Sequence, residues 1–243
     1  VRDLVAWTAI AAPAGPVAMK LLAIDTTEDT CSAALSIDDA LIERFEWAPR
    51  RHSELILPMM DALLAEAGIT LSALDALAFA RGPGGFTGVR IAASIVQGAA
   101  FGADLPVVPV SSLQALAHGC AMTHDADAVL AALDARMGEV YWGSFRCGAG
   151  AIMRVVGDEL VSKPSAVPVP EGGGWSAVGS GWQTYANELS ARCAVPSAVY
   201  ADARVHADAV AQLALVLFAE GHAVSAEQAL PVYLRDQVAW AKS

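Results

Sequence analysis

Two stretches about a hundred residues apart share one pattern, in which an apolar strand ends in an aspartate, five further residues follow and the chain returns as a second strand. The first copy is Ala23-Ile24-Asp25 and the second is Ala132-Leu133-Asp134. A match this short can arise by chance, but each copy stands at the head of one half of the chain, which favours an internal duplication. The repeat therefore predicts an α/β chain built from two related lobes.

The first half follows a regular order of apolar runs and turn signals, whereas the second half is thinner. Three strands separated by polar turns predict a meander, and Gly68 is expected to end the helix that follows them. The first half is expected to contain strands at 20–25, 31–37, 41–47, 74–80 and 107–110 and helices at 53–67 and 87–101. The second is expected to contain strands at 128–133, 140–145 and 177–181 and helices at 182–192 and 206–221.

A glycine-rich loop joins a buried strand to a helix in the first half. Glycines at this density favour a backbone with positive φ or a very close approach to another group, and Thr87 is expected to cap the helix. The loop has neither the Gly-Lys-Ser/Thr of a P-loop nor the spacing of a dinucleotide fingerprint. We therefore rank a structural turn first, a partner contact second and a ligand site third for Arg81, Gly82, Pro83, Gly84, Gly85, Phe86, Thr87, Gly88 and Arg90.

Composition narrows the functional classes. The net charge of −11 argues against direct binding to a nucleic-acid backbone, which needs clustered lysine and arginine. The four cysteines form no Cys-x-x-Cys pair and the five histidines form no pair at helical spacing. These spacings predict neither a disulfide framework nor a metal site, so a reducing cytosol is the expected compartment.

The first residues faintly imitate a signal peptide. Met19 directly precedes a strong strand, however, so we expect residues 1–18 to be a disordered or non-native N-terminal extension. Outside them, no uncharged run reaches the length of a transmembrane helix.

Two β-β-β-α-β-α units that each open on a strand and an aspartate resemble the actin-like ATPase and sugar-kinase (ASKHA) superfold, with the second lobe reduced. Within it, five motifs in order resemble the bacterial TsaB family, also called YeaZ. These motifs are LAIDTT at 22–27, HSELILP at 52–58, RGPGGFTGVR at 81–90, ALDARMGEVY at 132–141 and LPVYLR at 230–235. The expected divisions are the extension 1–18, a first lobe 19–117, a second lobe 118–205 and a C-terminal helix and tail at 206–243 that packs back on the lobes.

The resemblance implies a cytoplasmic protein required to make N6-threonylcarbamoyladenosine next to the anticodon of tRNAs that read codons beginning with A. Family members act as the non-catalytic partner of a paralogous transferase, TsaD, alongside an ATPase, TsaE. The expected partners are therefore a TsaD-type paralogue, a TsaE-type ATPase, a second copy when the protein is alone, and tRNA through the complex; no membrane is expected.

The resemblance also implies an absence of catalytic and metal-binding residues. The catalytic paralogue holds a metal through a His-x-x-x-His pair, and by alignment Ser112 and Leu116 stand in those places here. A serine hydroxyl is a poor ligand for a transition metal and leucine is none.

The first phosphate loop of the superfold corresponds to Asp25, Thr26 and Thr27. An aspartate that merely orders its own turn is the favoured interpretation. In the second half, Arg136 and Met137 make the equivalent turn bulky. We expect no intrinsic cofactor and no ATP hydrolysis, and weak or interface-shared binding of ATP or ADP is left open.

The two helices of the first half carry more apolar surface than one core face needs. Ordinary burial against the sheet explains part of it, and the functional interpretation is that the outer faces form a helix bundle with a partner subunit. The residues expected at this interface are Leu55, Ile56, Met59, Met60, Leu63, Ile91 and Ile95.

The second hypothesis is an active ATPase or peptidase of the same superfold. The third hypothesis is a small-molecule kinase. Ser111, Ser112 and His118 are close in sequence, but no carboxylate that would orient the base is evident. The sequence leaves open the oligomeric state, direct tRNA contact, the true translation start and the role of the tail.

Overall fold

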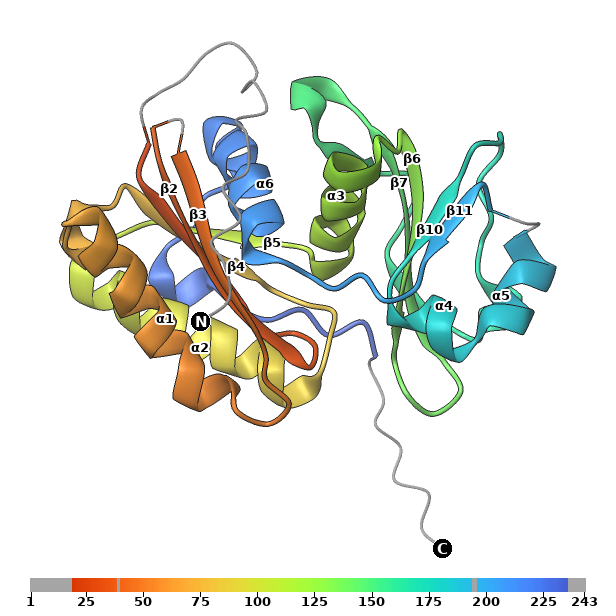
Figure 1. The fold of residues 1–243 in the computed structure, drawn as a ribbon, viewed down its shortest axis with the longest axis horizontal. Coiled ribbons are helices and arrows are strands. Elements are labelled where there is room, and N and C mark those ends of the chain that lie inside the picture. Colours follow the sequence, from red (N-terminus) through yellow and green to blue (C-terminus); the bar gives the residue numbers. More distant parts are fainter. Residues whose placement is uncertain (1–18, 39, 194–195, 236–243) are drawn as a thin grey trace, which may run out of the picture.

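The computed structural model describes residues 19–38, 40–193 and 196–235. The expected extension 1–18 and the end of the tail lie outside the described residues. The chain forms two mixed sheets with helices on both faces of each (Figure 1). Among the described residues, none of the helices is both long and apolar enough to cross a bilayer.

The first half contains the five strands and two helices expected there, followed by one further helix that was not expected. Its elements are β1 (Leu21–Asp25), β2 (Thr30–Ile37), β3 (Ala40–Trp47), α1 (His52–Ala67), β4 (Ala76–Ala80), α2 (Phe86–Ala103), β5 (Val107–Val110) and α3 (Ser112–His124). Gly68 ends α1 in the left-handed conformation, with φ of 67°, as predicted.

The second half has shorter elements. They are β6 (Ala128–Asp134), β7 (Val140–Cys147), β8 (Met153–Val155), β9 (Leu160–Ser162), β10 (Ser176–Val178), α4 (Ser180–Thr184), α5 (Ala186–Cys193), β11 (Ala198–Tyr200) and α6 (Ala207–Ala219). The single helix expected at 182–192 is wrong: Tyr185 leaves helical geometry, with φ of −123° and ψ of 37°, and separates α4 from α5.

The two sheets have the same internal plan. In the first, the order is β3-β2-β1-β4-β5, with β1 antiparallel to β2 and parallel to β4. In the second, β8-β7-β6-β10-β11 repeats this order, with β6 antiparallel to β7 and parallel to β10. This is the arrangement that the repeated strand–aspartate–strand pattern predicts. The second copy has no α-helix between its third and fourth strand positions within the described residues.

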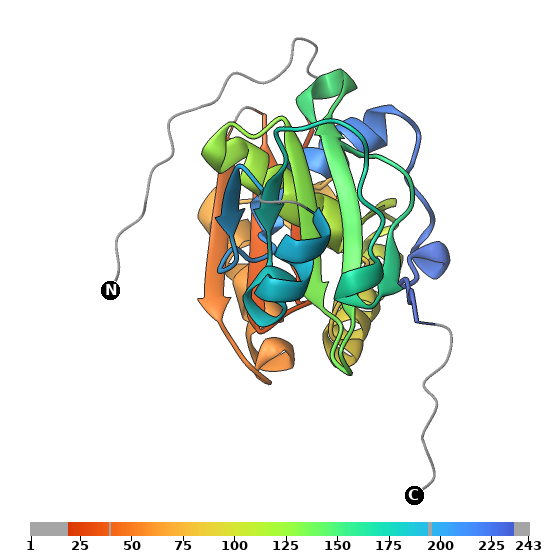
Figure 2. The same ribbon diagram turned by 90° about the vertical axis from the view of Figure 1, so that its right-hand side faces the viewer.

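The helices form three layers around the two sheets. On the outer face of the first sheet lie α1 and α2, while α4 and α5 lie on the outer face of the second sheet, toward the viewer in Figure 2. Between the sheets lie α6 and α3. Along β1 the side chains alternate: Leu21 and Ala23 enter the central core, and Leu22 and Ile24 enter the core beneath α1 and α2.

The two central helices are exchanged between the halves. Although α3 follows the first sheet in the chain, it packs on β6, β7 and β8; α6 follows the second sheet but packs on β1, β2, β4 and β5. The expected lobe boundary after residue 117 falls inside α3. The inner face of the first sheet is lined by small side chains such as Ala23, Ala34 and Ala78, which let α6 approach closely.

Candidate functional site

The turn after β1 is completely enclosed. Asp25, Thr26 and Thr27 are each 0% exposed. The backbone N–H and the hydroxyl of Thr27 both donate to Asp25 Oδ1, at 3.2 and 2.6 Å. The aspartate therefore orders its own turn, and in this conformation none of the three side chains is accessible to a nucleotide.

Burial changes the protonation of Asp25. It raises the pKa of the carboxyl from 3.8 to about 7, and the nearby charge of Glu28 adds to this, while the hydrogen bonds from Thr27 oppose it. Asp25 Oδ2 accepts no hydrogen bond from any described residue. The carboxyl therefore holds its proton over most of the mildly acidic range.

The glycine loop covers this turn. Gly85 N–H donates to the Thr27 carbonyl at 2.7 Å, and the Thr26 hydroxyl donates to the Gly88 carbonyl at 2.8 Å. A Cβ atom on Gly88 would lie 1.9 Å from the Thr26 carbonyl oxygen, and one on Gly84 would lie 2.6 Å from that of Thr27. The glycines are thus required by the close approach of two backbones, which supports the structural interpretation of the loop.

Thr87 does not cap α2, so that expectation is wrong. The helix begins one residue earlier, at Phe86, and Gly85 takes the cap position. Backbone contact between Gly85 and Thr27 fixes where the helix starts, and Thr87 is left exposed on the first turn.

The segment 230–235 joins motifs that are far apart in sequence. Val232 N–H donates to the Arg81 carbonyl at 2.8 Å, and Arg90 Nε donates to the Tyr233 hydroxyl at 2.8 Å. At the end of the segment, Arg235 forms an ion pair with Glu139 in the turn between β6 and β7. The segment therefore runs from the glycine loop to the second aspartate turn, a role that the sequence left open for the tail.

Glu28 is a half-buried connection between the halves that sequence reasoning missed. Its carboxylate accepts from the Ser180 hydroxyl at 3.0 Å and from Val205 N–H at 3.4 Å. Burial raises its pKa, while the charge of Arg204 opposes this shift. The only sequence signal was an acidic residue directly after the Asp-Thr-Thr turn.

Much of the predicted partner face is internal. The structure places Ile56, Met59, Met60 and Leu63 in the core between α1, α2 and the first sheet, with exposed fractions between 0% and 8%. The prediction that these four residues contact a partner is wrong: they are core residues. The first sheet packs against most of the wide apolar arc of α1. Leu55, Ile91 and Ile95 are half-buried at the edge of that core.

Large apolar side chains are nevertheless exposed on these two helices. Leu57 of α1 is 50% exposed, and Phe86 and Phe101 of α2 are 57% and 75% exposed. The Arg90 guanidinium lies 3.7 Å from the centre of the Phe86 ring, within cation–π distance. Within the part of the chain that the structure describes, each end of α2 therefore presents an exposed aromatic side chain.

The residues considered for a peptidase do not form a catalytic arrangement. Ser112 and His118 are buried, and burial lowers the pKa of His118 to about 4. Ser111 caps α3 by accepting from Gln114 N–H at 3.2 Å, and its hydroxyl donates to Glu159. A carboxylate is thus present, contrary to expectation, but it contacts the serine directly and no histidine lies between them.

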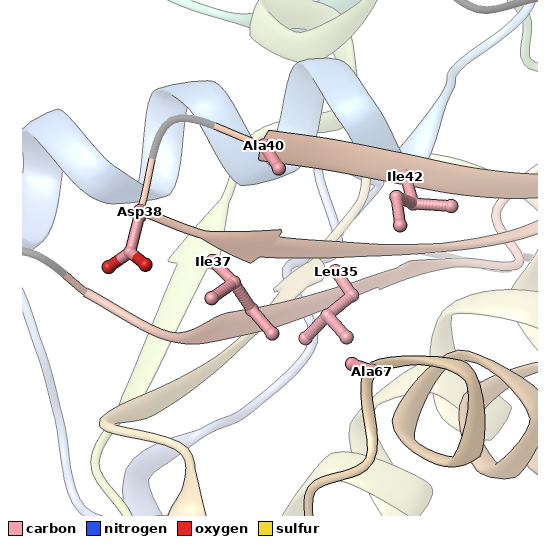
Figure 3. A pocket seen from close by; sticks show the side chains of 6 residues that line it. All are labelled: Leu35, Ile37, Asp38, Ala40, Ile42 and Ala67. Atoms are coloured by element: carbon pink, nitrogen blue, oxygen red, sulfur yellow. The ribbon is translucent and has the colours of Figure 1, made fainter.

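One open pocket lies at the β2–β3 hairpin, with a volume of about 570 Å³ (Figure 3). Leu35 and Ile37 lie in it near Ala67 of α1, and Asp38 supplies the carboxylate at the turn. Asp38 is the only polar side chain among the six described residues that line it, so these six bring together no reactive pair.

Comparison with known proteins agrees with this architecture. The family model described as TsaD, tRNA N6-adenosine threonylcarbamoyltransferase, matches residues 46–243. The tRNA threonylcarbamoyladenosine biosynthesis protein TsaB of Escherichia coli is 43% identical over 92% of this chain and 98% of its own length. The protein of the same name from Haemophilus influenzae is 39% identical over 92% of this chain and 97% of its own length. The structure of YeaZ from Pseudomonas aeruginosa superposes with a TM-score of 0.85 at 45% identity, covering 89% of this chain and all of that one. The chain has an α/β fold of the actin-like type. It belongs to the TsaB (YeaZ) family, which is part of the wider family described by the TsaD model.

Proposed function

We propose that this protein is a non-catalytic subunit for threonylcarbamoyl transfer to adenosine in tRNA. In this proposal it pairs with a TsaD-type transferase, acts alongside a TsaE-type ATPase in the cytoplasm, and meets tRNA only within that complex. The observation that carries the proposal is similarity over almost the full length of proteins named for threonylcarbamoyladenosine biosynthesis.

Two features of the chain support a role without chemistry of its own. The Asp25 turn is enclosed by the glycine loop, and the two positions aligned with the paralogue's histidines are filled by a buried serine and a buried leucine, Ser112 and Leu116. The net charge of −11 supports tRNA binding through partners rather than by this chain alone.

The partner surface in this proposal is the outer face of α2 with the adjoining edge of α1. Exposed aromatic and aliphatic side chains on helices are typical of subunit interfaces. Without the transferase, the same face would pair with a second copy. A nucleotide, if one is used, would be shared across this interface.

Reconstitution tests the function. Purified protein, transferase and ATPase are combined with tRNA, threonine, bicarbonate and ATP, together with the enzyme that forms the activated threonylcarbamoyl donor, and each component is omitted in turn. We expect modified adenosine only when this chain is present, and no turnover of ATP or peptide by the isolated chain. Robust modification in its absence, or isolated activity abolished by Asp25→Asn or Ser112→Ala, would favour the enzyme alternative.

Interface variants test the surface separately. Ile95→Asp and Phe101→Asp should leave the circular dichroism spectrum intact but abolish co-elution with the transferase on size exclusion. Val199→Asp, at a site 50% exposed on the second sheet, is the matched control and should co-elute normally. Met60→Asp should instead unfold the protein, because Met60 is 3% exposed. Complexes that survive both α2 changes would show that the surface lies elsewhere.

A further inference from the structure

Three side chains with metal-ligating atoms converge where α6 begins. Glu43 comes from β3, and His206 and Asp208 come from the start of α6. His206 Nδ1 lies 2.9 Å from Glu43 Oε2, and one ligand atom from each of the three residues lies within 4.8 Å of the others. Glu43 and His206 are 163 residues apart, so spacing along the chain could not reveal this set.

Capping of α6 explains only part of the arrangement. Glu43 Oε1 accepts from Asp208 N–H at 3.2 Å, and Asp208 Oδ1 accepts from Ala209 N–H at 2.5 Å. Each carboxylate thus uses one oxygen for the helix. The other oxygen of Glu43 faces His206, and the other oxygen of Asp208 accepts no hydrogen bond from the described residues. One carboxylate is enough to cap a helix, so capping does not explain why two carboxylates lie at the start of α6.

A third carboxyl group faces the same helix terminus. In the register of β1 and β2, Asp25 stands directly opposite Ser32, so the two side chains share one face of the sheet. The Ser32 hydroxyl accepts from Ala207 N–H at 3.0 Å, which places this face against the start of α6. Asp25 is fully buried and its Oδ2 has no partner among the described residues. Asp25 is therefore a third acidic group on the face of the sheet that meets the start of α6, outside the set of three ligands.

The surrounding charges favour a cation. The charges of Asp25, Glu43 and Asp208 act on His206, the charge of Glu28 acts on Asp25, and the charge of Arg204 acts on Glu28. Four carboxyl groups against one guanidinium leave the negative charge at this end of α6 incompletely balanced.

We propose that Glu43, His206 and Asp208 bind a divalent transition-metal ion, with Zn²⁺ as the representative ion. One imidazole and two carboxylates suit Zn²⁺, whereas Mg²⁺ and Ca²⁺ favour sets made of oxygen alone. Three protein ligands leave a fourth position for water, and the His206 side chain is 40% exposed, which gives the ion a route in. Binding of the ion would replace the hydrogen bond between His206 Nδ1 and Glu43, and any proton displaced from the ligands would pass to the solvent.

Such an ion would connect the two halves of the chain. Glu43 belongs to the edge strand of the first sheet, and His206 lies at the end of the segment that leaves β11 of the second sheet. Ion binding would therefore hold the start of α6 against β3 and stabilise the folded chain by mass action.

Calorimetric titration of the full chain with Zn²⁺ tests the site, at pH 7.5 in a non-chelating buffer with a phosphine reductant. We expect one ion per chain, a rise in the melting temperature, and no comparable binding of Mg²⁺. Glu43→Gln and His206→Asn should each weaken binding by at least about tenfold. His222→Asn is the matched control and should bind like the original protein, because His222 is a 62% exposed histidine on the loop after α6.

Zinc X-ray absorption on the unaltered protein provides a readout that does not depend on whether variants fold. We expect nitrogen and oxygen neighbours only, with the scattering signature of one imidazole. Sulfur neighbours would place the ion on a cysteine such as exposed Cys147 and would overturn the proposal. Absence of binding, or equal affinity in the Glu43 and His206 variants, would do the same.

Discussion

At the scale of single residues, the glycine at position 88 is fixed by contact with another backbone. A Cβ atom there would lie 1.9 Å from the Thr26 carbonyl oxygen, whereas one on Gly98 of the same helix would meet nothing within 4 Å. We expect Gly88→Ala to lower the free energy of unfolding by about 2–3 kcal/mol, as overpacking does. Gly98→Ala should raise it by about 0.5–1 kcal/mol through helix propensity alone. Urea unfolding of both variants measures this, and equal stability of the two would refute the packing argument.

Asp25 gives the folded protein a pH dependence of unusual sign. Unfolded, the carboxyl ionises near pH 4; folded, it ionises near pH 7, so the native state binds more protons in between. Stability from this group therefore falls as the pH rises through that window, by about 2–3 kcal/mol between pH 5 and pH 8. The Asp25→Asn side chain still has an oxygen that can accept the hydrogen bonds from Thr27, but it has no carboxyl group to titrate.

Urea unfolding at pH 5 and pH 8 checks this difference. The Asp25→Asn protein should lose less stability than the original protein between the two values, and Asp61→Asn, at an exposed position on α1, should behave like the original. Parallel pH profiles for the original and the Asp25 variant would contradict the burial argument.

The turn and the glycine loop could be recognised as special from sequence because both carry local signals, but their contact could not. An aspartate followed by two threonines predicts a self-ordered turn, and repeated glycines predict close approach. Nothing local indicates that Gly85 and Gly88 approach Thr26 and Thr27, because that depends on how α2 packs on the sheet. The same limit explains the wrong cap at Thr87.

At the scale of elements, the segment 230–235 is expected to stabilise the protein through its contact with the second half. The Arg235 and Glu139 side chains are 19% and 33% exposed, so solvent screens their ion pair only in part. A double-mutant cycle of Arg235→Gln and Glu139→Gln should give a coupling of about 1 kcal/mol. The Arg51–Glu54 pair of α1, at 3.4 Å and 55% and 68% exposed, is the control and should couple more weakly. A cycle at Arg235 and Glu139 that shows no coupling would mean that the segment rests there without adding stability.

Apolar periodicity predicted where the helices lie in the sequence, but not which of their apolar side chains are buried against the sheet. The pattern on α1 gave its bounds to within one residue, since His52–Ala67 was expected as 53–67. A wide apolar arc, however, is compatible with a broad core contact or with an outer interface, and for Met59 and Met60 the sheet beneath decides. Only the three-dimensional packing shows that the exposed apolar surface belongs to residues such as Leu57 and Phe101.

At the scale of the whole molecule, the exchange of α3 and α6 joins the two halves into one core. The central cluster contains β1 residues such as Ala23, β6 residues such as Val129, and side chains of both helices, including Leu116 and Leu213. The duplicated pattern predicted two lobes, but it could not predict that each lobe supplies the other's inner helix. Damage to one half should therefore destabilise the other.

Leu22→Ala tests this cooperativity. Leu22 is buried beneath α1 and α2, away from the central cluster, and its truncation should cost about 2–4 kcal/mol. Hydrogen exchange at low urea then reports on the amides of β6, in the other half. If the chain unfolds as one unit, the opening free energy of β6 should fall by the same amount. Leu57→Ala, at an exposed site on α1, should leave it unchanged. Exchange in β6 that is unaffected by Leu22→Ala would mean that the halves unfold independently despite their shared helices.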